Sequence, residues 1–73
     1  MNSIPQVKVM RRLMRLTQEE FAAQFRIPLE ALRNWETGKT QPDAVARAYL
    51  TAIERDPEGM RKALAGGASR LDS

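Results

Sequence analysis

TQEEFAAQFRIPLEALRNWETG, residues 17–38, is the stretch that decides the fold of this chain. Thr17 and Glu20 are spaced so that each side chain can accept a hydrogen bond from the other's backbone N–H, as in a capping box. Leu16 and Phe21 flank this pair at the positions of a hydrophobic staple. Both signals predict a helix that begins at Thr17.

A proline marks the end of this helix and the start of another. Proline disfavours helical conformation in the residue before it, so the first helix should not continue past Ile27. Pro28 suits the first turn of a second helix, where its missing N–H costs nothing. Leu32 and Trp35 then face inward, and Gly38 is a C-terminal cap. The prediction is a helix-turn-helix whose second helix has a polar outer face.

The motifs TQEEFAA and LRNWETGK, followed by Pro42, resemble the Cro/phage-repressor-like (XRE-type) helix-turn-helix family over residues 11–42. This resemblance implies an all-α, compact DNA-binding domain. The family often has Gly at the position of Arg26, and Ser or Thr at the position of Pro28. We therefore expect a left-handed Arg26, at a cost of about 1 kcal/mol, and no hydroxyl cap on the second helix.

The composition excludes several classes of function. With 73 residues and neither Cys nor His, the chain forms one small domain without disulfides, thiolate sites or imidazole ligands. It has no convergent carboxylates, and Gly38-Lys39-Thr40 is not a nucleotide-binding loop because position 33 lacks the required Gly. No apolar run approaches the roughly 18–20 residues of a membrane span. We expect a cytoplasmic, nucleoid-associated protein that has no cofactor or metal and is not an enzyme.

Positive charge is concentrated in the part of the chain that holds the helix-turn-helix. Residues 1–42 contain seven Lys and Arg against four Glu, whereas residues 43–73 contain five basic and five acidic residues. An excess of this kind favours a polyanionic partner, here double-stranded DNA.

The first expected helix is amphipathic and basic. Its apolar face consists of Val7, Met10, Leu13 and Met14, and its basic face of Lys8, Arg11, Arg12 and Arg15. The basic face is either simply solvated or supplies Arg11 and Arg15 to DNA phosphates. A membrane-surface helix is the least favoured alternative, because the apolar face is short and has no aromatic residue.

Specificity should come from the second helix of the motif. Arg33 can donate two hydrogen bonds to guanine, and Asn34 can pair with adenine. Glu30 can either accept from cytosine or simply stabilise the helix N-terminus. Leu29 can contact a thymine methyl group or pack within the protein. The family resemblance implies base or backbone contacts at these four positions.

Phosphate contacts are expected around the motif. Gln18 lies in the first turn of its helix, where N–H groups and the helix dipole favour an anion. The family resemblance implies that it contacts a phosphate or a base, and the alternative is a solvated side chain. Lys39 and Thr40, in the polar loop after the second helix, are candidate phosphate clamps, although the loop can also be merely solvated.

Two further helices complete the expected five. Residues 43–55 carry an apolar stripe of Val45, Ala48, Tyr49, Ala52 and Ile53 with Leu50 beside it. Asp56-Pro57 ends that helix and caps a fifth, which should run to Leu64. Gly66-Gly67 should then end the order, giving a single domain over residues 1–65 and a disordered tail over residues 66–73.

A homodimer is expected because one helix in one groove reads too few base pairs to select a site. Two copies would read a palindromic operator through helices about 34 Å apart. The expected dimer surface consists of Tyr49, Leu50, Ile53, Met60 and Leu64.

The sequence therefore predicts a sequence-specific DNA-binding transcriptional regulator acting as a repressor. The later part of the chain is also similar to small HigA-type antitoxins, which implies a cognate toxin as a second partner. The alternative is a helical protein–protein interaction adaptor that does not bind DNA.

Overall fold

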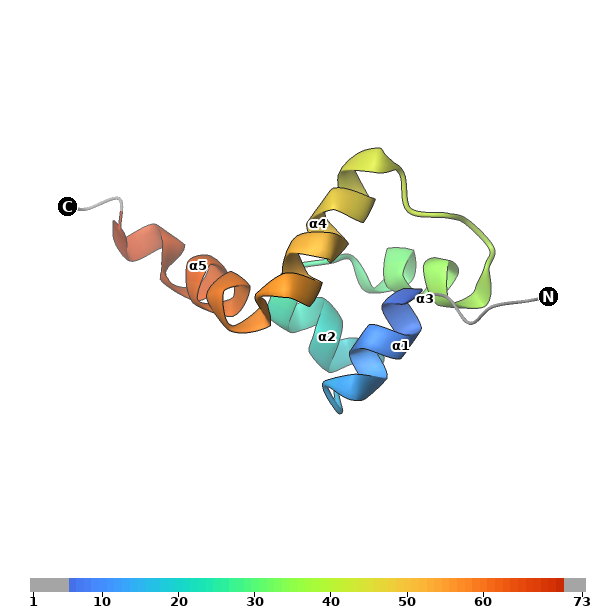
Figure 1. Ribbon diagram of the computed structural model, residues 1–73, viewed down its shortest axis with the longest axis horizontal. Coiled ribbons are helices and arrows are strands. Elements are labelled where there is room, and N and C mark those ends of the chain that lie inside the picture. The colour runs from blue at the N-terminus through green and yellow to red at the C-terminus, as the bar shows by residue number, and fades with distance from the viewer. Residues whose placement is uncertain (1–5, 71–73) are drawn as a thin grey trace.

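The computed structural model describes residues 6–70, with side chains for residues 6–65. This part of the chain forms five α-helices and no strand, as the sequence predicts. They are α1 (Gln6–Leu13), α2 (Gln18–Phe25), α3 (Leu29–Thr37), α4 (Ala44–Arg55) and α5 (Pro57–Arg70) (Figure 1). The helix α2 packs against α3, α1 packs against α3, and α5 packs against both α4 and α2.

The core forms where the first four helices meet. It consists of the buried side chains Val7, Met10, Phe21, Ala22, Phe25, Ile27, Leu32 and Ile53. Phe21 and Phe25 contact each other at a ring separation of 5.0 Å. Small Ala22 lies between them in the sequence and lets a neighbouring helix approach α2 closely. Burial of these residues holds the two helices of the motif in a fixed relation.

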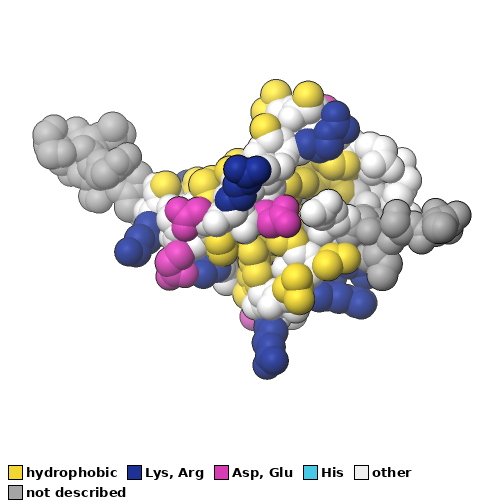
Figure 2. Space-filling model, in the orientation of Figure 1, with side chains coloured by type: hydrophobic (Ala, Val, Ile, Leu, Met, Phe, Trp, Pro, Cys, Tyr) yellow, Lys and Arg dark blue, Asp and Glu magenta, His cyan; other side chains and the backbone are white. Residues whose placement is uncertain are grey.

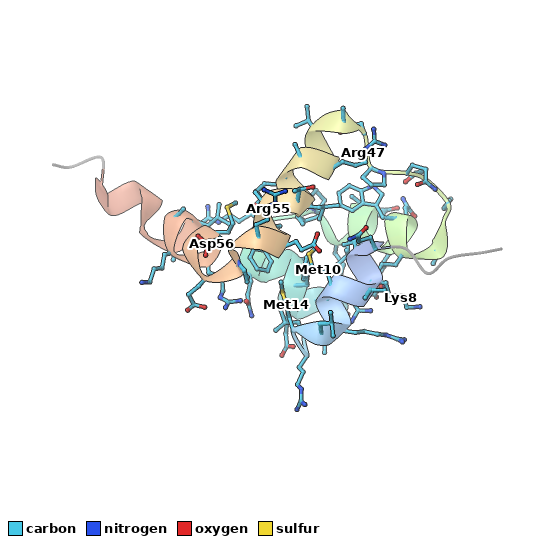
Figure 3. All side chains as sticks on the ribbon, viewed as in Figure 1. Lys8, Met10, Met14, Arg47, Arg55 and Asp56 are labelled. Carbon is cyan, nitrogen blue, oxygen red and sulfur yellow. The ribbon has the colours of Figure 1, made fainter. Side chains whose placement is uncertain are left out.

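Three residues that were expected on apolar faces are exposed. Leu13 in the last turn of α1 and Val45 in the first turn of α4 are each 79% exposed, and Ala48 of α4 is exposed as well. As expected, Met10 of α1 and Met14 just after it point toward the centre of the molecule, whereas Lys8 points away (Figure 3). Leu13 and Val45 lie at helix ends, where no neighbouring helix covers them.

The fifth helix is longer than expected. Asp56 caps it by accepting a 3.0 Å hydrogen bond from the N–H of Gly59, as predicted. Its backbone then remains helical through Gly66 and Gly67 to Arg70, so the expected end at Leu64 is wrong. Helical hydrogen bonding therefore outweighs the poor helix propensity of the two glycines. Residues 71–73 of the expected tail lie outside the described residues.

Candidate nucleic-acid interface

The start of α2 is fixed by the predicted capping box. The Thr17 hydroxyl accepts from the Glu20 N–H at 3.0 Å, and the Glu20 carboxylate accepts from the Thr17 N–H at 2.9 Å. These bonds satisfy two N–H groups that the helix itself leaves unpaired. They place Gln18 and Glu19 in the first turn of α2.

The turn between α2 and α3 has the left-handed residue that was expected. Arg26 has φ 55° and ψ 45°, and the N–H groups of Arg26 and Ile27 both bond to the Ala22 carbonyl. The Arg26 guanidinium also donates to the Leu64 carbonyl of α5 at 3.1 Å. Pro28 begins α3 without a side-chain cap, as predicted. Three residues, Arg26 to Pro28, therefore form the turn between the two helices.

The outer face of α3 carries most of the expected base contacts. Glu30 and Arg33 are exposed, Asn34 is half-buried, and the Arg33 side chain keeps 53% of its surface exposed. The opposite face of the same helix buries Leu32 completely. One side of α3 is thus bound into the core while the other presents a cation, an amide and a carboxylate.

Leu29 differs from its neighbours on this helix. It is half-buried and packs against the hydrophobic core. The sequence left two roles open for Leu29, a contact with a thymine methyl group and packing within the protein. Packing covers most of the Leu29 side chain.

Arg11 lies in an ion pair rather than on a basic outer face. Its Nε donates to Glu36 Oε2 at 2.7 Å and its Nη2 to Glu36 Oε1 at 2.8 Å. Its Nη1 also donates to the Leu16 carbonyl at 2.9 Å. The side chains of Arg11 and Glu36 are only 12% and 2% exposed. This position does not favour the expected phosphate contact of Arg11.

The ion pair changes the ionisation of both groups. Burial alone would raise the pKa of Glu36, but hydrogen bonds from Arg11 and Gln18 outweigh it, and the pKa is lowered. The hydrogen bond to Glu36 likewise raises the pKa of Arg11 against the opposing effect of desolvation. Both groups are therefore charged at neutral pH, and α1 is bonded to α3.

Sequence reasoning missed Glu36, although a signal was present. Glu36 follows Leu32 by four residues, so it shares the inward face of α3. A buried carboxylate on that face has to be paired with a cation. The cation, Arg11, lies 25 residues earlier in the chain, which the helical periodicity of either segment cannot reveal.

Gln18 is held by the same carboxylate. Its Nε2 donates to Glu36 Oε1 at 3.1 Å, so the amide oxygen and the second amide hydrogen remain for other partners. The side chain is half-buried at the start of α2. The hydrogen bond to Glu36 thus fixes the orientation of the Gln18 side chain, which is compatible with its expected role at a phosphate.

The remaining expected phosphate contacts lie on loops at helix ends. Gly38 ends α3 with φ 83°, and the N–H groups of Lys39 and Thr40 bond back to the Asn34 carbonyl. Lys39 and Thr40 are exposed there. Arg15 is exposed on the connection between α1 and α2, with φ 61°. All three side chains are on the surface, next to the ends of the motif helices.

The expected dimer residues divide into two groups. Ile53 is 0% exposed, so it is a core residue and has no surface to offer to a second chain. The other four, Tyr49, Leu50, Met60 and Leu64, are half-buried and pack against the core. The Tyr49 hydroxyl also donates to the Phe25 carbonyl at 2.6 Å, which ties α4 to the end of α2.

Other hydrophobic side chains are more exposed than these. Leu13 and Val45 were noted above, and Val9 of α1 is 41% exposed. Hydrophobic side chains gather over α1 and α4 on the face shown in Figure 2. No described helix is both long and apolar enough to cross a bilayer.

Comparison with known proteins places this geometry in a family. Residues 7–44 match a helix-turn-helix family model. A crystal structure of an HTH XRE-family like protein from Agrobacterium tumefaciens superposes with a TM-score of 0.81 at 55% identity. The match covers 82% of this chain and 97% of that one. A search of curated proteins finds no match.

Proposed function

Because this chain belongs to the XRE-type helix-turn-helix family, whose members are DNA-binding regulators and not enzymes, we propose that it is a sequence-specific transcriptional repressor. The outer face of α3 carries this proposal. It projects Glu30 and Arg33 into solvent while the inner face is locked in the core through Leu32. A helix with its side chains is about 10–12 Å wide, and the major groove of B-DNA, about 12 Å wide, admits it.

We assign the recognition of DNA bases to three residues of α3. Arg33 would donate to guanine O6 and N7, and Asn34 to the adenine edge. Glu30 would accept from cytosine N4. Leu29, being largely packed, would add at most an apolar contact with a thymine methyl group through its exposed part.

Phosphate contacts would fix the position of α3 in the groove. Exposed Lys39, Thr40 and Arg15 supply donors at the loops, and Gln18 supplies its free amide hydrogen together with the N-terminus of α2. Arg11 is no longer part of this set, since Glu36 holds it. Each charged contact should contribute about one unit to the salt dependence of binding.

The repressor would act as a homodimer on a palindromic operator, in the cytoplasm at the nucleoid. The half-buried side chains Leu50, Met60 and Leu64 of α4 and α5, with Tyr49 beside them, would form part of the contact between copies. Sedimentation at micromolar concentration, with and without operator, tests this part of the proposal. A monomeric mass in both cases would remove it.

Binding of a toxin would add a second role, that of an antitoxin. Three large hydrophobic side chains, Val9, Leu13 and Val45, are exposed in the monomer, and a protein partner could cover them. Co-expression with the product of a neighbouring gene in the same operon tests for a stable complex. A complex that is unaffected by Leu13→Ser would rule out a contact through the exposed side chains of α1.

In-vitro selection from a random DNA pool tests the main proposal. We expect an enriched palindrome whose half-site centres are about ten base pairs apart. Arg33→Ala should abolish the preference for one base pair in each half-site and cost about 1–3 kcal/mol. Arg55→Ala is the matched control, because it removes the same charge from an exposed position on α4 (Figure 3). No enrichment with the wild-type protein would refute the proposal.

A further inference from the structure

An ion pair joins the two helices of the motif on their outer side. Arg33 Nη2 lies 3.4 Å from Glu19 Oε2, and the two side chains are 53% and 64% exposed. Of the ion pairs among the described side chains, one lies between α1 and α3 and another lies within α5. The pair of Glu19 and Arg33 is the one that connects α2 with α3.

A carboxylate at this position is unfavourable for a surface that approaches DNA, because it repels phosphates. The adjacent Glu20 has a structural reason to be acidic, since it accepts the Thr17 N–H in the capping box. The helix dipole favours both carboxylates, since each lies in the first turn of α2. Neither effect accounts for the contact between Glu19 and Arg33.

We infer that Glu19 is a positioning residue that directs the Arg33 guanidinium to base edges and away from phosphates. This inference rests on the proposed function. The guanidinium has five N–H donors, and a contact at Nη2 alone leaves the others free for a guanine edge. Arg33 can therefore keep its contact with Glu19 while its other N–H groups donate to a base. If Arg33 swings away from Glu19 to reach a phosphate, it loses this contact and leaves the carboxylate unpaired on the surface that faces the DNA.

Glu19 should therefore weaken binding to unrelated DNA more than binding to the operator. An exposed pair of this kind changes an equilibrium by at most about fivefold. We expect the specificity ratio, operator affinity divided by affinity for a shuffled duplex, to fall about twofold to fivefold in Glu19→Ala. The change should come mainly from tighter binding to the shuffled duplex.

Fluorescence anisotropy with the selected operator and a shuffled duplex of the same length, at about 0.15 M salt, measures this ratio. Glu20→Gln is the matched control: it removes the same charge from the next residue, and Gln can still accept the capping hydrogen bond. This control should tighten binding to both duplexes by the same factor and leave the ratio unchanged. Matching thermal midpoints of the two variants would show that both are folded.

The double variant Glu19→Ala/Arg33→Ala separates positioning from general charge. If Glu19 acts through Arg33, then Glu19→Ala should not change the ratio when Arg33 is already absent. An equal fall of the ratio in both backgrounds, or equal ratios for Glu19→Ala and Glu20→Gln, would overturn the inference and leave the proposed function intact. A wild-type ratio of one would instead refute the proposed function, and the inference with it.

Discussion

Glu36→Gln should remove a large share of this domain's stability at neutral pH. The substitution preserves the shape of the side chain but removes the negative charge opposite Arg11, whose side chain is 12% exposed. Breaking a buried ion pair by removing one partner costs about 3–5 kcal/mol, because the other charge remains buried. A chain of 73 residues has a free energy of unfolding of roughly 4–11 kcal/mol in total. The loss should lower the thermal midpoint by more than about 10 °C.

The effect of Glu36→Gln should depend on pH. The folded state lowers the pKa of Glu36 below its value in the unfolded chain, so the ionised carboxylate contributes stability. That contribution is fully present above the unfolded pKa of about 4.3 and is lost as the pH falls through the lower folded value. The difference between wild type and variant should therefore be largest at neutral pH and shrink in acid.

Urea unfolding followed by circular dichroism at several pH values provides the measurement. Glu54→Gln is the control, because Glu54 is exposed and its loss should change stability by no more than about 0.5 kcal/mol. Arg11→Met/Glu36→Leu should recover much of the loss by replacing the pair with apolar packing. A Glu36→Gln variant within about 1 kcal/mol of wild type, or a double variant no more stable than the single one, would refute a stabilising role for the ion pair.

Three further changes test local features of the fold by the same unfolding assay. Thr17→Ala removes half of the capping box and should cost about 1 kcal/mol, whereas an unchanged midpoint would contradict the cap. Tyr49→Phe leaves the Phe25 carbonyl without its 2.6 Å donor and should cost about 0.5–1.5 kcal/mol, unless water takes the place of the hydroxyl. Arg15→Gly relieves a left-handed backbone with φ 61° and should stabilise the domain by about 0.5–1 kcal/mol; destabilisation would show that the side chain contributes to the fold.

The sequence predicts those features that depend on neighbouring residues. The capping box at Thr17, the break before Pro28, and the caps at Gly38 and Asp56 each involve groups within a few positions of one another, and the structure confirms them. The left-handed conformation of Arg26 was instead expected from the family resemblance, because the family often has Gly at this position.

Features that depend on tertiary contact could not be predicted in this way. Helical periodicity places Leu13 and Val45 on apolar stripes, but a neighbouring helix decides which part of a stripe is covered. Arg11 was assigned to the solvated side of its helix because its partner is distant in the sequence. The same limit applies to Ile53, which periodicity alone could not assign to the core or to an interface.

The bond between Arg11 and Glu36 also has a consequence for how this protein could change its preferred sequence during evolution. The inclination of α3 is set against α1 by residues 25 positions apart, neither of which presents its charge to solvent. A substitution that shifts α1 by a fraction of an ångström would tilt Arg33 and Asn34 together. Selection experiments for a new operator should therefore recover second-site changes in α1 as well as changes in the residues that touch bases.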